Sequence, residues 1–371
     1  MRNVIMMHSV GSVHTKWKEA WLSIETKQFE HFCKYLYKHK YRTHYLDHWY
    51  ENEGNGLSKK DLYLTFDDGY LDNLLVAYPI MKKYGIKGTI FVNPEFVDPS
   101  CGIRTLESNN GETLGFLNWD EIKFLDKTDE FDIQSHSMSH NFYFKSDKLI
   151  DIHDGNDKYH WLAWISRPDR KPYWQLEEQG NFTPNGFPVF EYYRALGLRR
   201  YFPDEDLIKL SEELYSKGTP QKEIIAQLNL FKASHPGRFE TDQEMESRFR
   251  YELFESKKIL EEKLSKKITI LCWPGGGYNK ASLRIVKEAG YLASTIASAD
   301  NAGFFDNKGK IYKRIVRYPM SSNVRCGQFI GKPRICTATL NSHLVFKLKS
   351  EEHNIIWLLM AKVRSLINRF L

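Results

Sequence analysis

The sequence predicts an α/β protein built on a parallel sheet, and three observations lead to that class. Six or seven short apolar segments are mostly followed by helical patterns, as in sheets whose parallel strands are joined by helices. Polar or unusual residues stand directly after four of these segments, and the carboxyl ends of barrel strands meet on one face. The alternation is interrupted once, over residues 142–250. We therefore expect an open α/β sheet or a closed barrel that carries a large insertion.

The alternation is regular in the first part of the chain. The run at 62–66 is largely apolar, which is typical of a buried strand, and Gly85 stops the helix that follows it. The helix over 26–37 places Phe29, Phe32 and Leu36 on one face. We predict strands over 3–8, 62–66, 87–92 and 131–135, and helices over 26–37, 70–84 and 118–125.

The interruption divides the chain into parts. Residues 1–141 and 251–340 are predicted to form the sheet or barrel, residues 142–250 an insertion at the rim of the site, and residues 341–371 a C-terminal amphipathic helix. The insertion holds aromatic, proline and glycine clusters and one clear amphipathic helix over 204–217. In the last part we predict helices over 242–265 and 280–289, a loop over 274–279, and strands over 268–273, 292–297 and 311–317.

Composition narrows the class of partner. The 371 residues carry a formal charge of +6, from 53 basic and 47 acidic side chains, without a dense Lys/Arg block of the kind that binds nucleic acid. The 9 Trp, 21 Tyr and 23 Phe suit a packed core and also a sugar-binding cleft. The five cysteines are scattered without a CxxC pair, which favours a reducing compartment over a disulfide framework or a zinc knuckle.

The two ends of the chain bear on localisation. The apolar part of the N-terminal segment is too short for a signal peptide, and no apolar run reaches the ~20 residues of a membrane span. We therefore expect a cytoplasmic protein. The tail over 354–371 is dense in apolar residues with basic residues among them. It is expected to pack on the barrel or on a second copy, or else to lie peripherally on the inner membrane.

Two short motifs carry the chemistry. Asp67 and Asp68 stand side by side at the end of a buried strand, where adjacent carboxylates persist if something cationic neutralises them. His136 and His140 are four residues apart, and on a helix both imidazoles would project from one face. Two histidines and one carboxylate suit zinc or another first-row divalent ion and leave coordination positions open. The alternatives are a chance HxxxH pair and an aspartate that caps the helix over 70–84.

These motifs resemble those of a known family. Residues 65–69 (TFDDG) and 136–140 (HSMSH), with the runs 117–120 and 131–135 before the histidines, look like the first two motifs of the polysaccharide deacetylase family, the NodB homology domain of carbohydrate esterase family four. The resemblance implies a distorted (β/α)7 barrel and metal-dependent removal of N-acetyl groups from amino sugars. It also implies that Asp68, His136 and His140 bind the metal, for which the ligand set favours Zn²⁺, and that Asp67 is the general base.

The later motifs depart from the family pattern. The arginine that normally precedes the Pro of the third motif and pairs with the catalytic carboxylate is absent from 272–275 (CWPG), and Arg314 or Arg317 is a candidate replacement. The family's C-terminal Leu-x-His, the usual general acid, has no good match. His8 is the candidate acid instead, because residues 5–10 are similar to the N-terminal segment of a rearranged-motif subgroup that includes poly-N-acetylglucosamine deacetylases. The alternative for His8 is a strand-end histidine bonded to its loop.

Candidate substrate residues come from three places. Glycines in the loop after the predicted strand at 268–273 would let backbone N–H groups approach a developing oxyanion. Aromatic residues of the insertion could stack on sugar faces or simply pack the insertion. The oxyanion and substrate candidates are Pro274, Gly275, Gly276, Tyr278 and Trp119, and the stacking candidates are Trp161, Trp164, Tyr173 and Trp174.

The sequence thus predicts a metal-dependent deacetylase. Its substrate would be the N-acetylated amino sugar of a cell-surface polysaccharide, or of a lipid- or nucleotide-linked precursor. Two alternatives stay open: a non-catalytic glycan-binding barrel, which the missing third-motif arginine favours, and an amidohydrolase that acts on a different amide.

Overall fold

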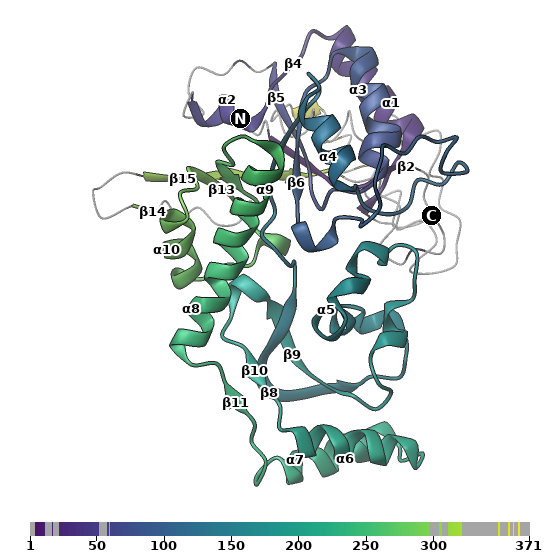
Figure 1. Cartoon of the computed structure of the whole chain (residues 1–371), viewed down its shortest axis with the longest axis vertical. Helices are drawn as coiled ribbons and strands as arrows, with labels where there is room; N and C mark the ends of the chain where they lie inside the picture. Colours follow the sequence, from purple (N-terminus) through teal and green to yellow (C-terminus); the bar gives the residue numbers. More distant parts are fainter. Residues whose placement is uncertain are drawn as a thin grey trace.

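Seven parallel strands form a barrel at one end of the molecule (Figure 1). The computed structural model describes residues 4–11, 17, 22–51, 58, 60–296, 304–305, 311–320, 348, 355–356, 359 and 363. In spatial order the strands are β1 (Val4–Met7), β5 (Asp61–Phe66), β6 (Gly88–Val92), β7 (Phe131–Ser135), β12 (Ile270–Leu271), β13 (Ala293–Ile296) and β15 (Ile311–Val316). Adjacent strands in this order pair in parallel.

One segment of the chain closes the barrel. β15 pairs with β13, and β16 (Tyr318–Pro319), which follows after a single residue, pairs in parallel with β1 through Ile5↔Tyr318. Two short strands extend the sheet, β4 (Arg42–Thr43) beside β5 and β14 (Phe304–Phe305) antiparallel to β15. The distorted (β/α)7 barrel implied by the family resemblance is confirmed as a nearly closed barrel, and the open sheet is not what forms.

Two apolar layers hold the barrel together. Inside it, alternate residues of the strands meet, such as Val4, Tyr63, Phe91 and Ile270. Outside it, a larger cluster joins the strands to the covering helices. Because each strand is buried on both faces, β5 contains no exposed residue, and its sequence is largely apolar.

The covering helices follow the predicted order with local differences. They are α1 (Thr26–Lys38), α2 (Leu46–Glu51), α3 (Tyr78–Tyr84), α4 (Trp119–Asp126), α8 (Asp242–Arg250), α9 (Ser256–Leu264) and α10 (Lys280–Glu288). The helix predicted over 70–84 starts with a π-helical turn, η2 (Asn73–Ala77), and a second π turn, η8 (Tyr251–Glu255), joins α8 to α9. Gly85 ends α3 as predicted, in the left-handed conformation with φ 62°.

The insertion is more regular than its sequence pattern indicated. Its centre is an antiparallel pair, β8 (Phe142–Ile152) and β9 (Pro188–Arg194), with α5 (Trp161–Ser166) between them in the chain. Beyond lie β10 (Tyr201–Phe202), α6 (Glu205–Ser216), α7 (Gln221–Phe231) and β11 (Arg238–Phe239). The prediction of one amphipathic helix was incomplete, because α7 packs on α6 as its antiparallel partner. Short helical turns are η3 (Pro94–Phe96), η4 (Asp157–Tyr159), η5 (Pro168–Tyr173), η6 (Gln179–Phe182), η7 (Ala195–Gly197) and η9 (Pro274–Gly276).

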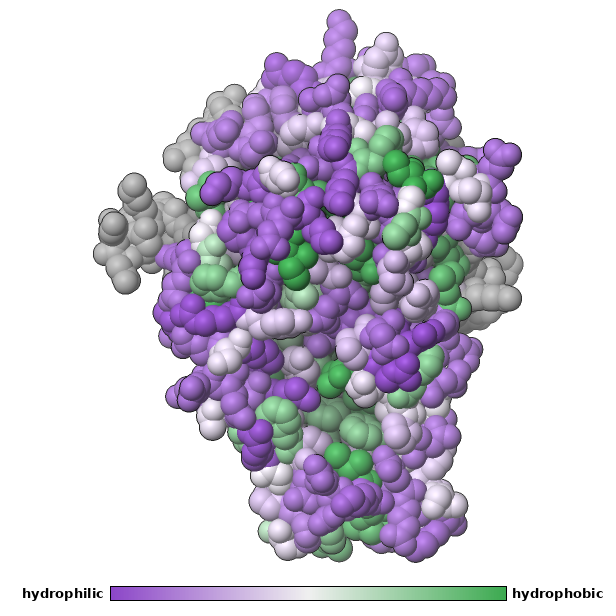
Figure 2. All heavy atoms as spheres, in the orientation of Figure 1, coloured by the Kyte–Doolittle hydropathy of each residue, from purple (hydrophilic) through white to green (hydrophobic). Residues whose placement is uncertain are grey.

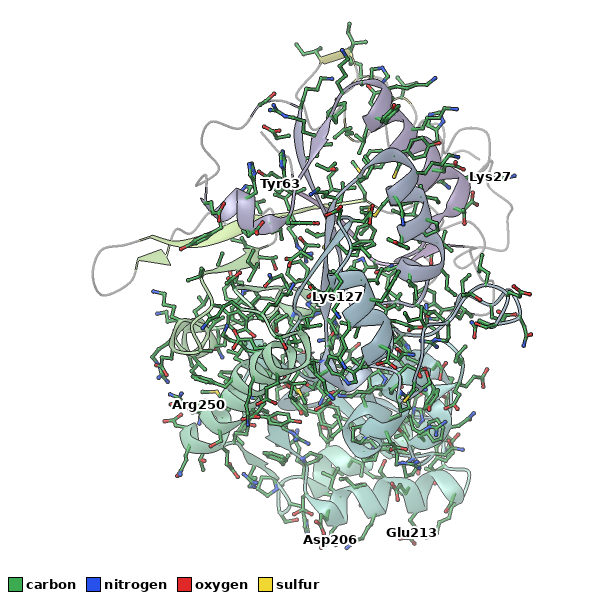
Figure 3. The ribbon with its side chains drawn as sticks, turned by 45° about the horizontal axis from the view of Figure 1, so that its top comes forward. Lys27, Tyr63, Lys127, Asp206, Glu213 and Arg250 are labelled. Atoms are coloured by element: carbon green, nitrogen blue, oxygen red, sulfur yellow. The ribbon has the colours of Figure 1, made fainter. Side chains whose placement is uncertain are left out.

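An aromatic cluster joins the insertion to the barrel. Trp161, Trp164 and Phe190 of the insertion share it with Phe96 and Phe116, which lie in loops of the barrel. The far end of the insertion is hydrophilic in Figure 2. There Asp206 and Glu213 point outward from α6 (Figure 3), and each pairs with a lysine of the same helix.

The C-terminal expectation falls mainly outside the described residues. Of the predicted helix over 341–371, only five residues are described. Leu348 is buried in the cluster between strands and helices, whereas Ile355, Ile356, Leu359 and Val363 are exposed. Within the described part of the chain, no helix is both long and apolar enough to cross a bilayer.

Candidate active site

Asp67 and Asp68 lie in the turn after β5, and their carboxylates point in different directions. The N–H of Asp67 still donates to the carbonyl of Met7 at 2.9 Å, which continues the pairing with β1. Asp68 and Gly69 both have φ 75°, and this left-handed turn is one that glycine adopts freely and Asp tolerates. Asp67 then faces Arg317, whereas Asp68 faces the two histidines.

The histidine motif is a loop, so the helical arrangement considered for residues 136–140 is not what forms. Ser137 and His140 have φ 63° and 52°, values that no α-helix contains. His136 lies directly after β7, and its Nδ1 is 2.9 Å from the carbonyl oxygen of Cys272, so Nδ1 carries the proton and Nε2 is left for Asp68. The Nε2 atoms of His136 and His140 lie 3.3 and 3.6 Å from Oδ1 of Asp68.

Buried side chains hold this loop in place. Glu252, from the π turn between α8 and α9, accepts from the N–H groups of Met138 (3.1 Å) and Ser139 (3.0 Å) and from the Ser139 hydroxyl. Lys171, from the insertion, is fully buried and donates to the carbonyl of Ser139 at 2.9 Å and to Glu95. The barrel and the insertion therefore both position His140.

The arginine between β15 and β16 pairs with Asp67. Arg317 donates from both terminal nitrogens to the carboxylate, at 2.5 and 2.8 Å, and to Sγ of Cys272 at 2.9 Å. Of the two candidate replacements for the missing third-motif arginine, Arg317 is the one that contacts Asp67, and the side chain of Arg314 lies outside the described residues. Burial raises the pKa of Asp67, but Arg317 outweighs that effect and holds the pKa below its ordinary value. Asp67 is therefore ionised at neutral pH.

His8 lies across from Arg317 on the same carboxylate. It follows β1, and its Nε2 is 3.9 Å from Oδ2 of Asp67. Its carbonyl accepts from Nδ2 of Asn73 at 3.1 Å, and the adjacent Ser9 hydroxyl donates to the buried carboxyl of Asp72. The turn after β5 thus also fixes the loop after β1.

The buried carboxyl of Asp72 makes stability depend on pH. Burial raises its pKa from 3.8 to about 6, against weaker opposing hydrogen bonds. The pKa of Asp72 is higher in the folded protein than in the unfolded chain, so its protonation stabilises the fold. This stabilisation is complete below pH 4 and is lost as the pH rises through about 6. The free energy of unfolding should decrease by ~3 kcal/mol over that range. Asp72→Asn should therefore raise the unfolding temperature at pH 8 and have little effect at pH 4. Equal effects at both pH values in thermal denaturation would contradict this.

The three metal candidates shift one another's pKa values. Burial raises the pKa of Asp68, but hydrogen bonding from His136 and the charge of His140 bring it well below its ordinary value. Burial lowers the pKa of His136, yet Cys272 and Asp68 raise it overall, and burial lowers that of His140 to about 4. A cation bound here would compete with protons for these ligand atoms. The affinity of the site for the cation should therefore decrease as the pH is lowered.

The donor set fits a divalent ion. One ligand atom each of Asp68, His136 and His140 lies within 4.8 Å of the others. An overlapping group, Asp67, His136 and Cys272, fits less well, because Arg317 already occupies the Asp67 and Cys272 atoms. Two imidazoles and one carboxylate match zinc and similar first-row ions.

The site opens into a cavity of about 590 Å³ between the barrel and the insertion. Its described lining includes His8, both aspartates, both histidines and Arg317, and the insertion contributes Trp161, Trp164, Trp174, Tyr192 and Arg194 among others. Of the oxyanion and substrate candidates, Gly275 and Gly276 line the cavity. Pro274, Tyr278, Trp119 and the stacking candidate Tyr173 are not among the described lining residues. Tyr278 packs on Trp273, and Trp119 lies under Lys263 on the outer face.

The structure defines the class of this protein as a parallel barrel. Two histidines and one carboxylate lie together at the carboxyl ends of its strands. The family model for polysaccharide deacetylases matches residues 54–166, which carry both aspartates and both histidines. The resemblance to that family is confirmed over this part of the chain. The polysaccharide deacetylase YxkH of Bacillus subtilis (strain 168) is 36% identical over 96 residues, which is 24% of this chain and 30% of that protein.

Solved structures with low sequence identity align over most of the chain. A de-N-acetylase from Aggregatibacter actinomycetemcomitans aligns at a TM-score of 0.49 and 16% identity, over 85% of this chain and 93% of its own. The BpsB deacetylase domain from Bordetella bronchiseptica aligns at 0.48 and 15%, over 86% and 95%.

Proposed function

We propose that this protein is a metal-dependent deacetylase that hydrolyses the N-acetyl group of an amino sugar. The observation that carries the proposal is the convergence of His8, Asp67, Asp68, His136 and His140 from three strand ends on one cavity. The match of residues 54–166 to the polysaccharide deacetylase model supports the same reaction.

Each group has a role that suits its surroundings. Asp68, His136 and His140 would hold the ion, which when bound would acidify water and polarise the amide carbonyl. Asp67, kept ionised by Arg317, accepts the proton of the water that attacks the amide carbon. His8 gives a proton to the amine nitrogen as the C–N bond breaks, so that acetate and the free amino sugar leave.

The pairing of Arg317 with Asp67 weighs against a barrel that has lost catalysis. That alternative was motivated by the missing third-motif arginine and the missing Leu-x-His, and Arg317, directly after β15, makes the contact expected of the arginine. A different amide, such as an N-formyl group, remains the second candidate, because the same groups would hydrolyse it.

The biological setting is part of the proposal. The substrate would belong to a cell-surface polysaccharide or to its lipid- or nucleotide-linked precursor, met in the cytoplasm. Peripheral contact with the inner membrane through the C-terminal residues is the associated expectation.

Removal of the metal should abolish the activity. Dialysis against dipicolinate should lower acetate release from N-acetylated oligosaccharides about 100-fold or more, and one equivalent of Zn²⁺ should restore it. Acetate is measured enzymatically, and metal content is measured on the same samples. Full activity in protein shown to be metal-free would refute the proposal, and release of formate but not acetate would favour the second candidate.

A further inference from the structure

Arg194 is a cation of the insertion that faces the candidate active site, and among the described residues it has no carboxylate partner. It is the last residue of β9 and lines the same cavity as the catalytic candidates. Its Nε is buried and has no hydrogen-bond partner among the residues that the structure describes. Within the described part of the chain, its guanidinium contacts the rings of Phe142 and Tyr193, at 4.6 and 6.0 Å from their centroids, and forms no ion pair.

The other charged groups of the lining are satisfied. Arg317 pairs with Asp67, Lys158 pairs with Asp151, and Asp68 lies against the two histidines. A guanidinium stays protonated at any ordinary pH, and a half-buried cation without a counter-charge is costly. Among the described lining residues, Arg194 therefore has positive charge left over for a ligand.

The glycine loop after β12 is shaped around this side chain. A Cβ atom on Gly275 would lie 2.2 Å from Nε of Arg194, and one on Gly277 would lie 2.2 Å from its Cβ. Both distances are shorter than any real contact, so side chains at these two positions would displace the arginine. Gly276, between them, has open space. Gly275, an oxyanion candidate, and Gly277 therefore also leave the room that Arg194 occupies beside the cavity.

We propose that Arg194 binds an anionic group of the substrate, a phosphate or a carboxylate carried by the N-acetylated sugar. This inference rests on the proposed deacetylase function and narrows its substrate class. A guanidinium suits both anions, because its parallel N–H groups can donate in pairs. Arg194 lines the same cavity as His140 and Asp68, so the anion would lie close to the reacting amide.

Sugar binding can be followed separately from turnover by the fluorescence of the tryptophans in the cavity. The full-length, zinc-loaded protein is titrated with N-acetylglucosamine, its 1-phosphate, its 6-phosphate and N-acetylmuramic acid. We expect at least one anionic sugar to bind about tenfold more tightly than the neutral one, equivalent to ~1.4 kcal/mol. The phosphate and carboxylate probes distinguish the two anions.

Variants then assign the preference to one side chain. Arg194→Gln should remove the preference and leave neutral binding within about twofold, because the lost interaction is only with the anion. Arg194→Met, which keeps the stem that packs against the glycines, should do the same. Arg167→Gln is the matched control, since Arg167 is an exposed arginine of the insertion paired with Asp169.

Two results would overturn the inference. One is equal affinity of the wild-type protein for neutral and anionic sugars. The other is equal weakening of both by the Arg194 variants, which would mean that Arg194 acts on the reacting amide or on the loop. Acetate release on the same samples separates the two proposals: turnover without anion preference overturns this inference alone, and anion preference without any turnover overturns the deacetylase function.

Discussion

Asp67→Asn should lower acetate release by about 10²–10⁴-fold while the bound metal is retained. Asparagine cannot accept the proton of the attacking water. The three ligand candidates, Asp68, His136 and His140, are unchanged, so zinc content should stay at the wild-type level. The amide oxygen can still accept a hydrogen bond from Arg317, which limits the damage to the fold.

The readouts for this variant are acetate release, metal content and thermal unfolding. Asp206→Asn is the matched control, because Asp206 is an exposed aspartate at the far end of the insertion, paired with Lys209. It should match wild type in all three. Full activity in Asp67→Asn would show that another group is the base, and loss of zinc would show that Asp67 is itself a ligand.

Lys171→Met should destabilise the fold and loosen the metal centre together. Lys171 is fully buried, and its removal takes the charged donor from Glu95, which keeps the Tyr251 hydroxyl, and also the side-chain donor from the carbonyl of Ser139. Breaking one side of such a pair costs about 3–5 kcal/mol, and loss of support behind a ligand loop weakens metal binding about 10–100-fold. The measurements are denaturant unfolding and zinc competition with a chromophoric chelator.

Lys209→Met is the control for Lys171→Met, because Lys209 is an exposed lysine of α6. If Lys171→Met fails to fold, Glu95→Gln is the second variant. It weakens the same ion pair at a smaller cost in stability, because Glu95 is partly exposed. A destabilised protein with unchanged zinc affinity would mean that Lys171 only anchors the insertion and does not position His140.

The barrel and the core of its site were predictable because their signals are local. A strand between helices is buried on both faces, so each strand of the barrel reads as a short apolar run, as β5 does. The carboxyl ends of parallel strands share one face, so His8, Asp67 and His136 could be placed together without coordinates. The spacing of His136 and His140 indicated a shared ion, although the loop that joins them is not helical.

The insertion was predicted poorly because its structure depends on pairing between distant segments. β8 pairs with β9 across a long stretch of intervening chain, and α7 is stabilised mainly by packing on α6. The orientation of Trp119 also depends on tertiary structure, and its predicted role was not supported. Its place in a familiar run indicated substrate contact, but α4 turns it toward Lys263 on the outer face.

The sequence by itself determined the buried parallel strands and the pairing of the two aspartates with the two histidines, since strand burial and motif spacing are properties of neighbouring residues. Only the tertiary structure decided which arginine neutralises Asp67, which lysine holds the histidine loop and which cation faces the cavity unpaired. Arg317, Lys171 and Arg194 come from segments far from their targets in the chain, and such contacts arise only when the strands close and the insertion docks.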